Sequence, residues 1–230
     1  MSIRENFERV RDRVAAAAVG AGRTPEEITI IGVTKTHGPE TVIEAIKAGI
    51  TDVGENRVQE FLSKVDDVGL DVRWHLIGHL QTNKVNKVIG RFAMIHSVDS
   101  FNLAEKISNA GEREGVVTDI LLEVNTSGEK SKFGLVPDET MDISERVSGL
   151  PAVNLRGLMT VGPWVDDVAV LSKAFAGLRL LGEKIDAMKI DNISIEHLSM
   201  GMTDDFEIAV AEGATMVRPG RVIFGERGTF

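Results

Sequence analysis

The sequence predicts an α/β protein of the (β/α)₈ TIM-barrel class, a closed barrel of eight parallel strands with helices outside. Eight short apolar stretches follow one another along the chain, and helical patterns lie between them. Continuous apolar stretches of this kind are typical of strands buried on both faces, as in parallel sheets. The length of 230 residues is slightly below the roughly 250 residues of a typical barrel.

The strands are predicted, in chain order, at residues 28–35, 52–55, 72–79, 94–98, 119–125, 154–161, 193–200 and 216–224. Helices are predicted at 2–20, 40–48, 101–114 and 168–188, where apolar residues recur three or four positions apart. The first of them precedes the first strand and is therefore an extra amino-terminal helix. An open doubly wound sheet is the alternative, but it needs fewer strands or a separate segment, and no Pro/Ser-rich linker divides the chain. We expect one domain over residues 1–230.

The composition excludes several classes of protein. Thirty-five acidic residues against 26 Lys and Arg give a net charge of -9, which argues against a nucleic-acid or anionic-membrane partner. The absence of Cys excludes disulfides, thiolate metal sites and a cysteine nucleophile. The charged amino terminus and the lack of an apolar run of about 18 residues argue against a signal peptide or membrane span. We expect a soluble, cytoplasmic protein.

Lys35 ends the first predicted strand, at the barrel face where functional groups of this fold lie. Burial disfavours the charged form of a lysine, lowers its pKa and so makes the amine a nucleophile. Such an amine forms an imine with an aldehyde. A strand-end lysine that simply reaches solvent is the alternative, and position alone favours it. Other polar or functional side chains at predicted strand ends are Asn56, His79, Gln81, Asn125, Met159, Thr160, Ser199 and Arg218.

Two loops near residues 200 and 220 have the composition of a phosphate site. Ser199 and Thr203 bracket a Met-Gly-Met turn that runs into a helical pattern, and Arg218 and Gly220 belong to an Arg-Pro-Gly-Arg segment that ends at Arg221. Hydroxyls and backbone N–H groups at such turns donate to phosphate, and glycine lets the backbone approach a ligand. Helix caps and ordinary turns are the alternative reading. The loops after strands seven and eight form the recurrent phosphate site of these barrels, which favours phosphate.

A Schiff-base lysine opposite a phosphate site points to pyridoxal 5′-phosphate (PLP) above other ligands. A sugar-phosphate aldolase would use the same two parts, so position alone leaves both readings open.

Eight segments of the chain resemble the pyridoxal phosphate homeostasis family, also called the YggS/PROSC family. They cover nearly the whole chain, in order, and read VTKTHGPE (33–40), GENRVQE (54–60), WHLIGHLQTNK (74–84), HSVDS (96–100), VNTSGEKSKFGL (124–135), RGLMTVGP (156–163), LSMGMTDDFEIAV (198–210) and VRPGRVIFGER (217–227). The family is similar to the amino-terminal barrel of alanine racemase and to fold type III decarboxylases. The resemblance therefore implies a fold type III PLP barrel.

The resemblance also implies site residues. Lys35 is the residue that forms the Schiff base with PLP, and Asn56 is a polar neighbour of the cofactor ring. Ser199 is the phosphate ligand, with backbone N–H groups of Gly220 and Arg221 beside it and Thr203 as a weaker candidate. Arg218 faces the pyridine nitrogen. No metal site is implied.

Arg218 has a consequence for catalysis. A cation beside the ring nitrogen opposes its protonation, and an unprotonated ring is a weaker electron sink. Racemases of this fold use a tyrosine from a further domain as second base, whereas this sequence contains no tyrosine. We therefore expect a PLP carrier that buffers and hands on the cofactor, with apo-enzymes among its partners, and not an enzyme with robust turnover. A PLP-dependent racemase or lyase of low activity is the alternative.

Several other residues have a structural interpretation. His75 and His79 have a spacing that a metal pair could use, but a structural role is favoured because no third ligand is evident. Lys130 and Lys132 could receive the aldehyde on a loop, but solvated loop cations are the simpler interpretation. Trp74 and Trp164 are expected to be packing residues. No apolar surface suggests a dimer, so we expect a monomer.

Overall fold

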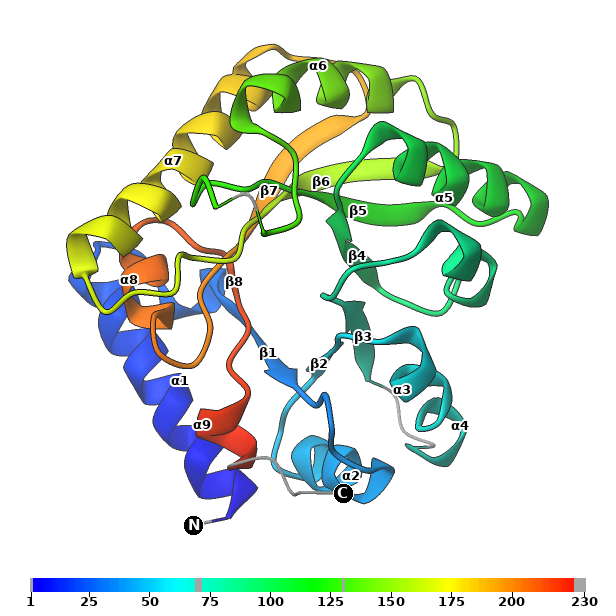
Figure 1. Cartoon of the computed structure of the whole chain (residues 1–230). Helices are drawn as coiled ribbons and strands as arrows, with labels where there is room; N and C mark the ends of the chain where they lie inside the picture. Colours follow the sequence, from blue (N-terminus) through cyan, green and yellow to red (C-terminus); the bar gives the residue numbers. More distant parts are fainter. Residues whose placement is uncertain (1, 69–71, 130, 226–230) are drawn as a thin grey trace.

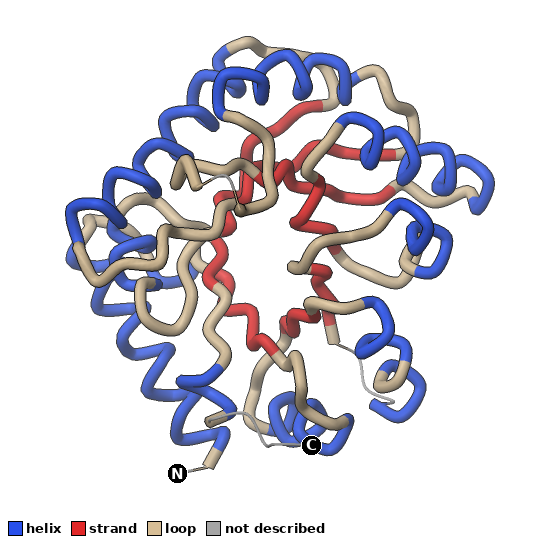
Figure 2. The backbone as a smooth tube through the Cα atoms, viewed as in Figure 1, coloured by secondary structure: helices blue, strands red, loops and turns tan. Residues whose placement is uncertain are grey.

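The computed structural model shows a closed barrel in which every strand pairs in parallel with the next one in the sequence. The structure describes residues 2–68, 72–129 and 131–225. The eighth strand pairs with the first, with Thr29 opposite Met216 and Ile30 opposite Val217, and this pairing closes the ring. Figures 1 and 2 show the ring of strands with the helices outside it. The predicted (β/α)₈ barrel is confirmed.

The bounds of the elements follow the predicted alternation. The strands are β1 (Thr29–Val33), β2 (Asp52–Glu55), β3 (Arg73–Leu76), β4 (Met94–Val98), β5 (Thr118–Glu123), β6 (Val153–Met159), β7 (Ile193–Ser199) and β8 (Met216–Val217). The helices are α1 (Ile3–Gly20), α2 (Pro39–Lys47), α3 (Val58–Leu62), α4 (Val65–Val68), α5 (Phe101–Glu114), α6 (Pro137–Ser148), α7 (Val168–Ala187), α8 (Phe206–Ala211) and α9 (Arg221–Phe224). Two 3₁₀ helices, η1 (Pro25–Glu27) and η2 (Thr82–Lys87), complete them.

The last predicted strand, 216–224, is wrong in its second half. The strand ends at Val217, and the chain turns at Gly220 into the short helix α9. Pro219 explains the change, because proline has no N–H to donate to a sheet and fixes φ. The apolar residues Val222, Ile223 and Phe224 therefore pack as part of a helix. The third strand is also shorter than predicted, so His79 lies beyond it.

The predicted amino-terminal helix is confirmed as α1. It begins with a capping box, in which Ser2 and Glu5 satisfy each other's backbone N–H groups. The buried residues Phe7, Val10 and Val14 lie on one face at helical spacing. In Figure 1 this helix runs alongside α8 and α9, so it covers the region where the barrel closes.

The hydrophobic core has two parts. The larger part joins the outer face of the strands to the helices. A separate cluster consists of residues from β1, β4, β5, β6 and β8, and it fills the inside of the barrel: Ile31, Met94, Leu121, Met159 and Met216. Because strand side chains alternate, residues two positions beyond Leu121 and Met216, namely Glu123 and Arg218, also point inward.

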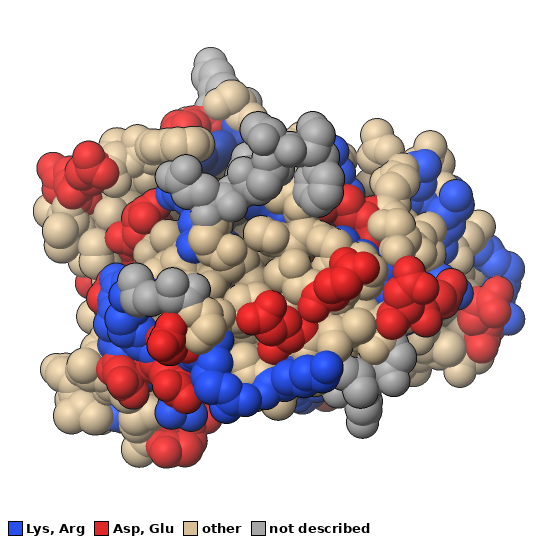
Figure 3. Space-filling view, turned by 90° about the horizontal axis from the view of Figure 1, so that it is seen from below, with Lys and Arg blue, Asp and Glu red and all other residues tan. Residues whose placement is uncertain are grey.

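None of the described helices is long and apolar enough to cross a bilayer. The face drawn in Figure 3 carries acidic and basic side chains interspersed among neutral ones.

Gly157 is required where β6 approaches β7. Its φ is 156°, and a Cβ there would overlap the backbone carbonyl of His197 on the neighbouring strand. We expect Gly157→Ala to lower the free energy of unfolding by at least about 2 kcal/mol. Gly177 in α7 is the matched control, because nothing lies within 4 Å of its added Cβ. Gly177→Ala should raise stability by up to about 1 kcal/mol. Urea denaturation of both variants measures this, and similar stabilities would contradict the assignment.

Candidate functional site

Lys35 lies two residues beyond the end of β1 and is half-buried. Val33 donates its backbone N–H to the carbonyl of Pro219 over 2.9 Å. This hydrogen bond brings the segment that carries Lys35 alongside the segment that carries Arg218 and Gly220. The closure of the barrel thus places the predicted Schiff-base lysine beside the predicted phosphate loops.

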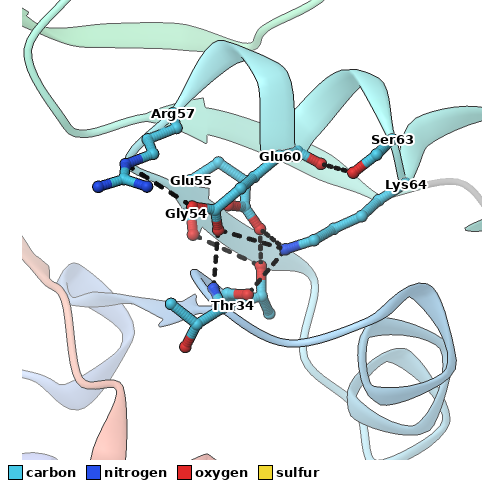
Figure 4. A network of polar contacts seen from close by, with 8 residues as sticks. Thr34, Gly54, Glu55, Arg57, Glu60, Ser63 and Lys64 are labelled. Carbon is cyan, nitrogen blue, oxygen red and sulfur yellow. Dashed lines mark hydrogen bonds and ion pairs between the residues drawn. The ribbon is translucent and has the colours of Figure 1, made fainter. Parts of the chain in front are cut away.

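Both neighbours of Lys35 are held by a polar network from β2, α3 and the residues after it (Figure 4). The ammonium of Lys64 donates to the carbonyl of Thr34 over 2.9 Å and pairs with Glu55 at 2.7 Å. Thr34 donates its hydroxyl to the same carboxylate oxygen of Glu55 over 2.6 Å. On the other side, Thr36 donates its backbone N–H to Glu60 over 2.7 Å. The backbone around Lys35 is therefore fixed on both sides.

The backbone conformation of Thr36 also indicates that the chain around Lys35 is held in place. Thr36 has φ = 67°, a left-handed conformation that β-branched residues rarely adopt. Such a conformation persists only where surrounding contacts hold it. The hydrogen bond from Thr36 to Glu60 is one such contact. The left-handed conformation of Thr36 turns the chain sharply just after Lys35.

The ion pair between Glu55 and Lys64 is nearly without solvent contact, with side-chain exposures of 0% and 4%. Burial raises the pKa of Glu55, whereas the nearby Lys64 cation and the Thr34 hydroxyl lower it. No local sequence pattern indicates this pair, because the two residues are nine positions apart and Lys64 lies between α3 and α4, outside the strand that carries Glu55.

We expect Lys64→Met to lower the free energy of unfolding by about 3–5 kcal/mol, since Glu55 would remain buried without its cation. The double variant Glu55→Gln/Lys64→Met removes both charges and should recover most of that loss. Urea denaturation near neutral pH measures both variants. If the double variant is no more stable than Lys64→Met, the buried charge is not the cause.

Arg218 is a second buried cation, with 4% exposure. It donates to the hydroxyl of Ser199 over 2.6 Å and to the carbonyl of Thr160 over 2.8 Å. Burial lowers its pKa to about 10, against the opposing effect of Asp205 and Glu123, so the guanidinium is charged at neutral pH. Ser199 is fully buried, and its hydroxyl also lies 2.9 Å from His96.

The two predicted phosphate loops lie together. Gly220 donates its backbone N–H to the hydroxyl of Thr203 over 3.2 Å, and Arg221 pairs with Asp204 at 2.7 Å. Gly201 turns the first loop with φ = 87°, and a Cβ there would meet Ala209 and Phe206 at 2.6 and 2.9 Å. Thr203, Gly220 and Arg221 thus form one group at the barrel mouth, whereas Ser199 lies deeper.

Asn56 follows β2 directly and is half-buried. Its backbone packs against Gly78, where a Cβ would overlap it, so the third strand's loop passes close to Asn56. Asn56 therefore lies near the mouth, on the side of the β2 and β3 strands.

Glu123 is a buried residue of the mouth that the sequence analysis did not single out. It ends β5, is 8% exposed, and lines a cavity of about 240 Å³ together with Asn125, Lys132 and Phe133. Burial raises its pKa from the ordinary value of 4.5 to about 7; Asp99 adds to this shift and Arg218 opposes it. A charged residue that closes the apolar run Ile-Leu-Leu was the available signal.

The raised pKa of Glu123 predicts that stability falls as pH rises. Between about pH 4.5 and 7 the folded state holds a proton that the unfolded state has lost, so the free energy of unfolding decreases, by up to about 3 kcal/mol. Glu123→Gln has no such loss. It should exceed the wild-type protein in stability at about pH 8, with a smaller difference at about pH 5. Chemical denaturation at both pH values measures this, and a difference that does not change with pH would contradict it.

The remaining predicted residues have structural contacts. His79 pairs with Asp99 at 3.1 Å and stacks on Phe133. Lys132 donates to the carbonyl of Gly162 over 2.8 Å and pairs with Glu129, while Lys130 lies outside the described residues. In the described part of the chain, no three His, Asp or Glu side chains are arranged to hold a metal ion.

Of the two tryptophans predicted to be packing residues, the prediction is confirmed for Trp74 and wrong for Trp164. Trp74 is buried and packs edge-on against Phe61, but Trp164 is 96% exposed. Trp164 lies in the loop between β6 and α7, where its side chain projects into solvent.

The family model described as "Alanine racemase, N-terminal domain" matches residues 2–228 of this chain. The chain is 41% identical over 228 residues to the pyridoxal phosphate homeostasis protein of Aquifex aeolicus, covering 99% of each chain. The chain belongs to the family of pyridoxal phosphate homeostasis proteins, which share the alanine racemase barrel. The predicted resemblance is confirmed.

Two solved structures are similar to this chain in fold. PipY of Synechococcus elongatus, determined with PLP bound, superposes with a TM-score of 0.86 at 33% identity, covering 97% of this chain and 100% of PipY. Alanine racemase of Clostridium difficile superposes with a TM-score of 0.77 at 18% identity, covering 99% of this chain and 57% of the racemase. The racemase likeness shows the shared fold alone.

Proposed function

We propose that this protein binds PLP as a Schiff base on Lys35 and takes part in intracellular PLP homeostasis by buffering the cofactor and handing it on. The observation that carries the proposal is the position of Lys35, half-buried at the mouth between two anchored threonines and beside the loop of Gly220. The names of its relatives and the PLP-bound structure of PipY support it.

The residues at the mouth fit the cofactor's functional groups. PLP supplies an aldehyde, which condenses with a primary amine and releases water, and a ring that withdraws electrons. Lys35 offers the amine. Thr203 offers a hydroxyl and Arg221 a backbone N–H for the phosphate, since the first N–H groups of a helix have no partner inside it. The N–H of Gly220, which donates to the Thr203 hydroxyl in this structure, lies beside them.

Asn56 and Arg218 are assigned to the ring, Asn56 as a polar neighbour and Arg218 toward the pyridine nitrogen. Ser199 was predicted to bind the phosphate. In the structure its hydroxyl contacts Arg218 and His96, so we now assign it to the support of Arg218 and place the phosphate at Thr203 and Gly220.

Arg218 favours binding over catalysis. Its guanidinium is charged and buried, and a second cation on the ring nitrogen would lie against it. The ring then remains unprotonated and withdraws electrons less strongly from a bound amino acid. The sequence also has no tyrosine to serve as a second base. Both points favour a carrier over the alternative, a PLP-dependent racemase or lyase.

We further propose that the protein is a cytoplasmic monomer whose partners include apo-enzymes that need PLP. The absence of Cys is consistent with a reducing compartment. Mixing the PLP-loaded protein with an apo-enzyme and following that enzyme's recovery of activity tests the transfer.

Lys35→Ala is expected to abolish the covalent adduct. The wild-type protein incubated with PLP should be yellow, and borohydride reduction should leave a pyridoxyl group on Lys35 that peptide mass spectrometry detects. Lys132→Ala is the matched control and should retain colour and adduct. A sugar-phosphate aldolase would instead stay colourless and be trapped at Lys35 only with a sugar phosphate. An unlabelled Lys35 in the wild-type protein, or rapid turnover of any amino acid in a broad panel, would contradict the carrier function.

A further inference from the structure

A row of polar side chains crosses the inside of the barrel from one end to the other. We define the buried row as Asp52, His75, His96, Ser199 and Arg218, whose exposed fractions are all 4% or less. They come from β2, β3, β4, β7 and the residue after β8. Asp52 begins β2 at the amino end of the barrel, and Arg218 lies at the carboxyl end, where the candidate site is.

Neighbouring members of the row are within hydrogen-bond distance of one another. Asp52 Oδ1 lies 2.9 Å from His75 Nε2, His75 Nδ1 lies 3.0 Å from His96 Nε2, and His96 Nδ1 lies 2.9 Å from Ser199 Oγ. Arg218 Nη1 completes the row, 2.6 Å from Ser199 Oγ. β4 and β7 are not neighbours in the barrel, so the contact between His96 and Ser199 spans its interior.

The chemistry of the two ends fixes the direction of every hydrogen bond. A guanidinium only donates, so Ser199 Oγ accepts from Arg218. The Ser199 hydroxyl then donates to His96 Nδ1, its other neighbour in the row. With Nδ1 accepting, a neutral His96 carries its hydrogen on Nε2 and donates it to His75 Nδ1. His75 in turn donates from Nε2 to the carboxylate of Asp52.

The electrostatics agree with this order. Burial lowers the pKa of His96 well below its ordinary value of 6.5, with His75 and Arg218 adding to the shift, so His96 is neutral. Burial would raise the pKa of Asp52, but hydrogen bonds from His75, Arg73 and Thr51 lower it to about 2, so Asp52 is ionised. The row therefore runs from a cation to an anion, and all its N–H and O–H groups point the same way.

The reverse order would leave a buried group unpaired. If His96 donated from Nδ1, Ser199 Oγ would accept from both His96 and Arg218, and its own hydrogen would have no acceptor within the row. A buried donor without an acceptor costs about 1–3 kcal/mol. In the order that starts at Arg218, the Ser199 hydroxyl and the Nε2 hydrogens of His96 and His75 each have an acceptor in the row.

We propose that the buried row positions Arg218, so that Asp52, His75, His96 and Ser199 hold its guanidinium at the place where it faces the cofactor ring. The inference rests on the proposed function, because it concerns how the protein sets the surroundings of bound PLP. The four residues act through Arg218 and are positioning residues. They make the affinity for PLP depend on groups at the opposite end of the barrel.

A double-mutant cycle tests the proposal. His96→Leu removes the acceptor of the Ser199 hydroxyl, and it should weaken PLP binding about tenfold and shift the visible absorption band. In the Arg218→Lys background the same substitution should have little further effect, because the residue through which it acts is already changed. Met94→Leu, a change of similar size two residues away inside the barrel, is the control and should bind as the wild type does.

The ligand-free protein gives a second readout. ¹⁵N NMR of the histidine side chains should show His75 and His96 both with the hydrogen on Nε2. A hydrogen on Nδ1 of either residue overturns the order of the row. Equal affinity and spectrum for His96→Leu and Met94→Leu, or additive effects in the cycle, overturn the positioning role. If the wild-type protein does not bind PLP, the proposed function fails, and the NMR result still decides the order of the row.

Discussion

The inside of a closed eight-stranded barrel has room for side chains and little else, so a polar group that points inward must find its partner there. Five apolar side chains fill part of this space, and Asp52, His75, His96, Ser199 and Arg218 lie in it as one hydrogen-bonded set. A cation at the carboxyl end is thereby connected through hydrogen bonds to an anion at the amino end. The charge of Arg218 is stabilised inside the protein by its hydrogen bonds to Ser199 and to the carbonyl of Thr160 and by the nearby carboxylates of Asp205 and Glu123.

The same constraint shapes the neighbourhood of Lys35. Glu55 and Lys64 are buried as a pair, and both contact Thr34, the residue before Lys35. Their contacts hold the backbone, so the side chain of Lys35 extends from a fixed segment of the main chain. Closure of the barrel through β1 and β8 then brings this segment beside Gly220. Lys35 and the proposed phosphate loop therefore meet at one mouth, although the sequence separates them by almost the whole chain.

Alanine racemase of Clostridium difficile has the same barrel as this protein. The two chains share the fold at 18% identity, and the barrel covers 57% of the racemase. A function has to be argued from the site and not from the fold. In the proposed site Lys35 supplies an amine, Arg218 is a buried cation at the place where an electron sink would need a carboxylate, and the sequence has no tyrosine. This combination suits holding an aldehyde better than moving a proton at a substrate carbon.

The sequence by itself determined the alternation of strands and helices, the position of Lys35 and the two loops around Thr203 and Gly220, because these depend on local patterns and on family motifs. Only the tertiary structure decided that Lys64 reaches Glu55 and that Ser199 contacts His96. The reason is that side-chain partners in a barrel are set by the stagger and closure of strands far apart in the chain. No local period encodes which inward residue of β4 meets which residue of β7.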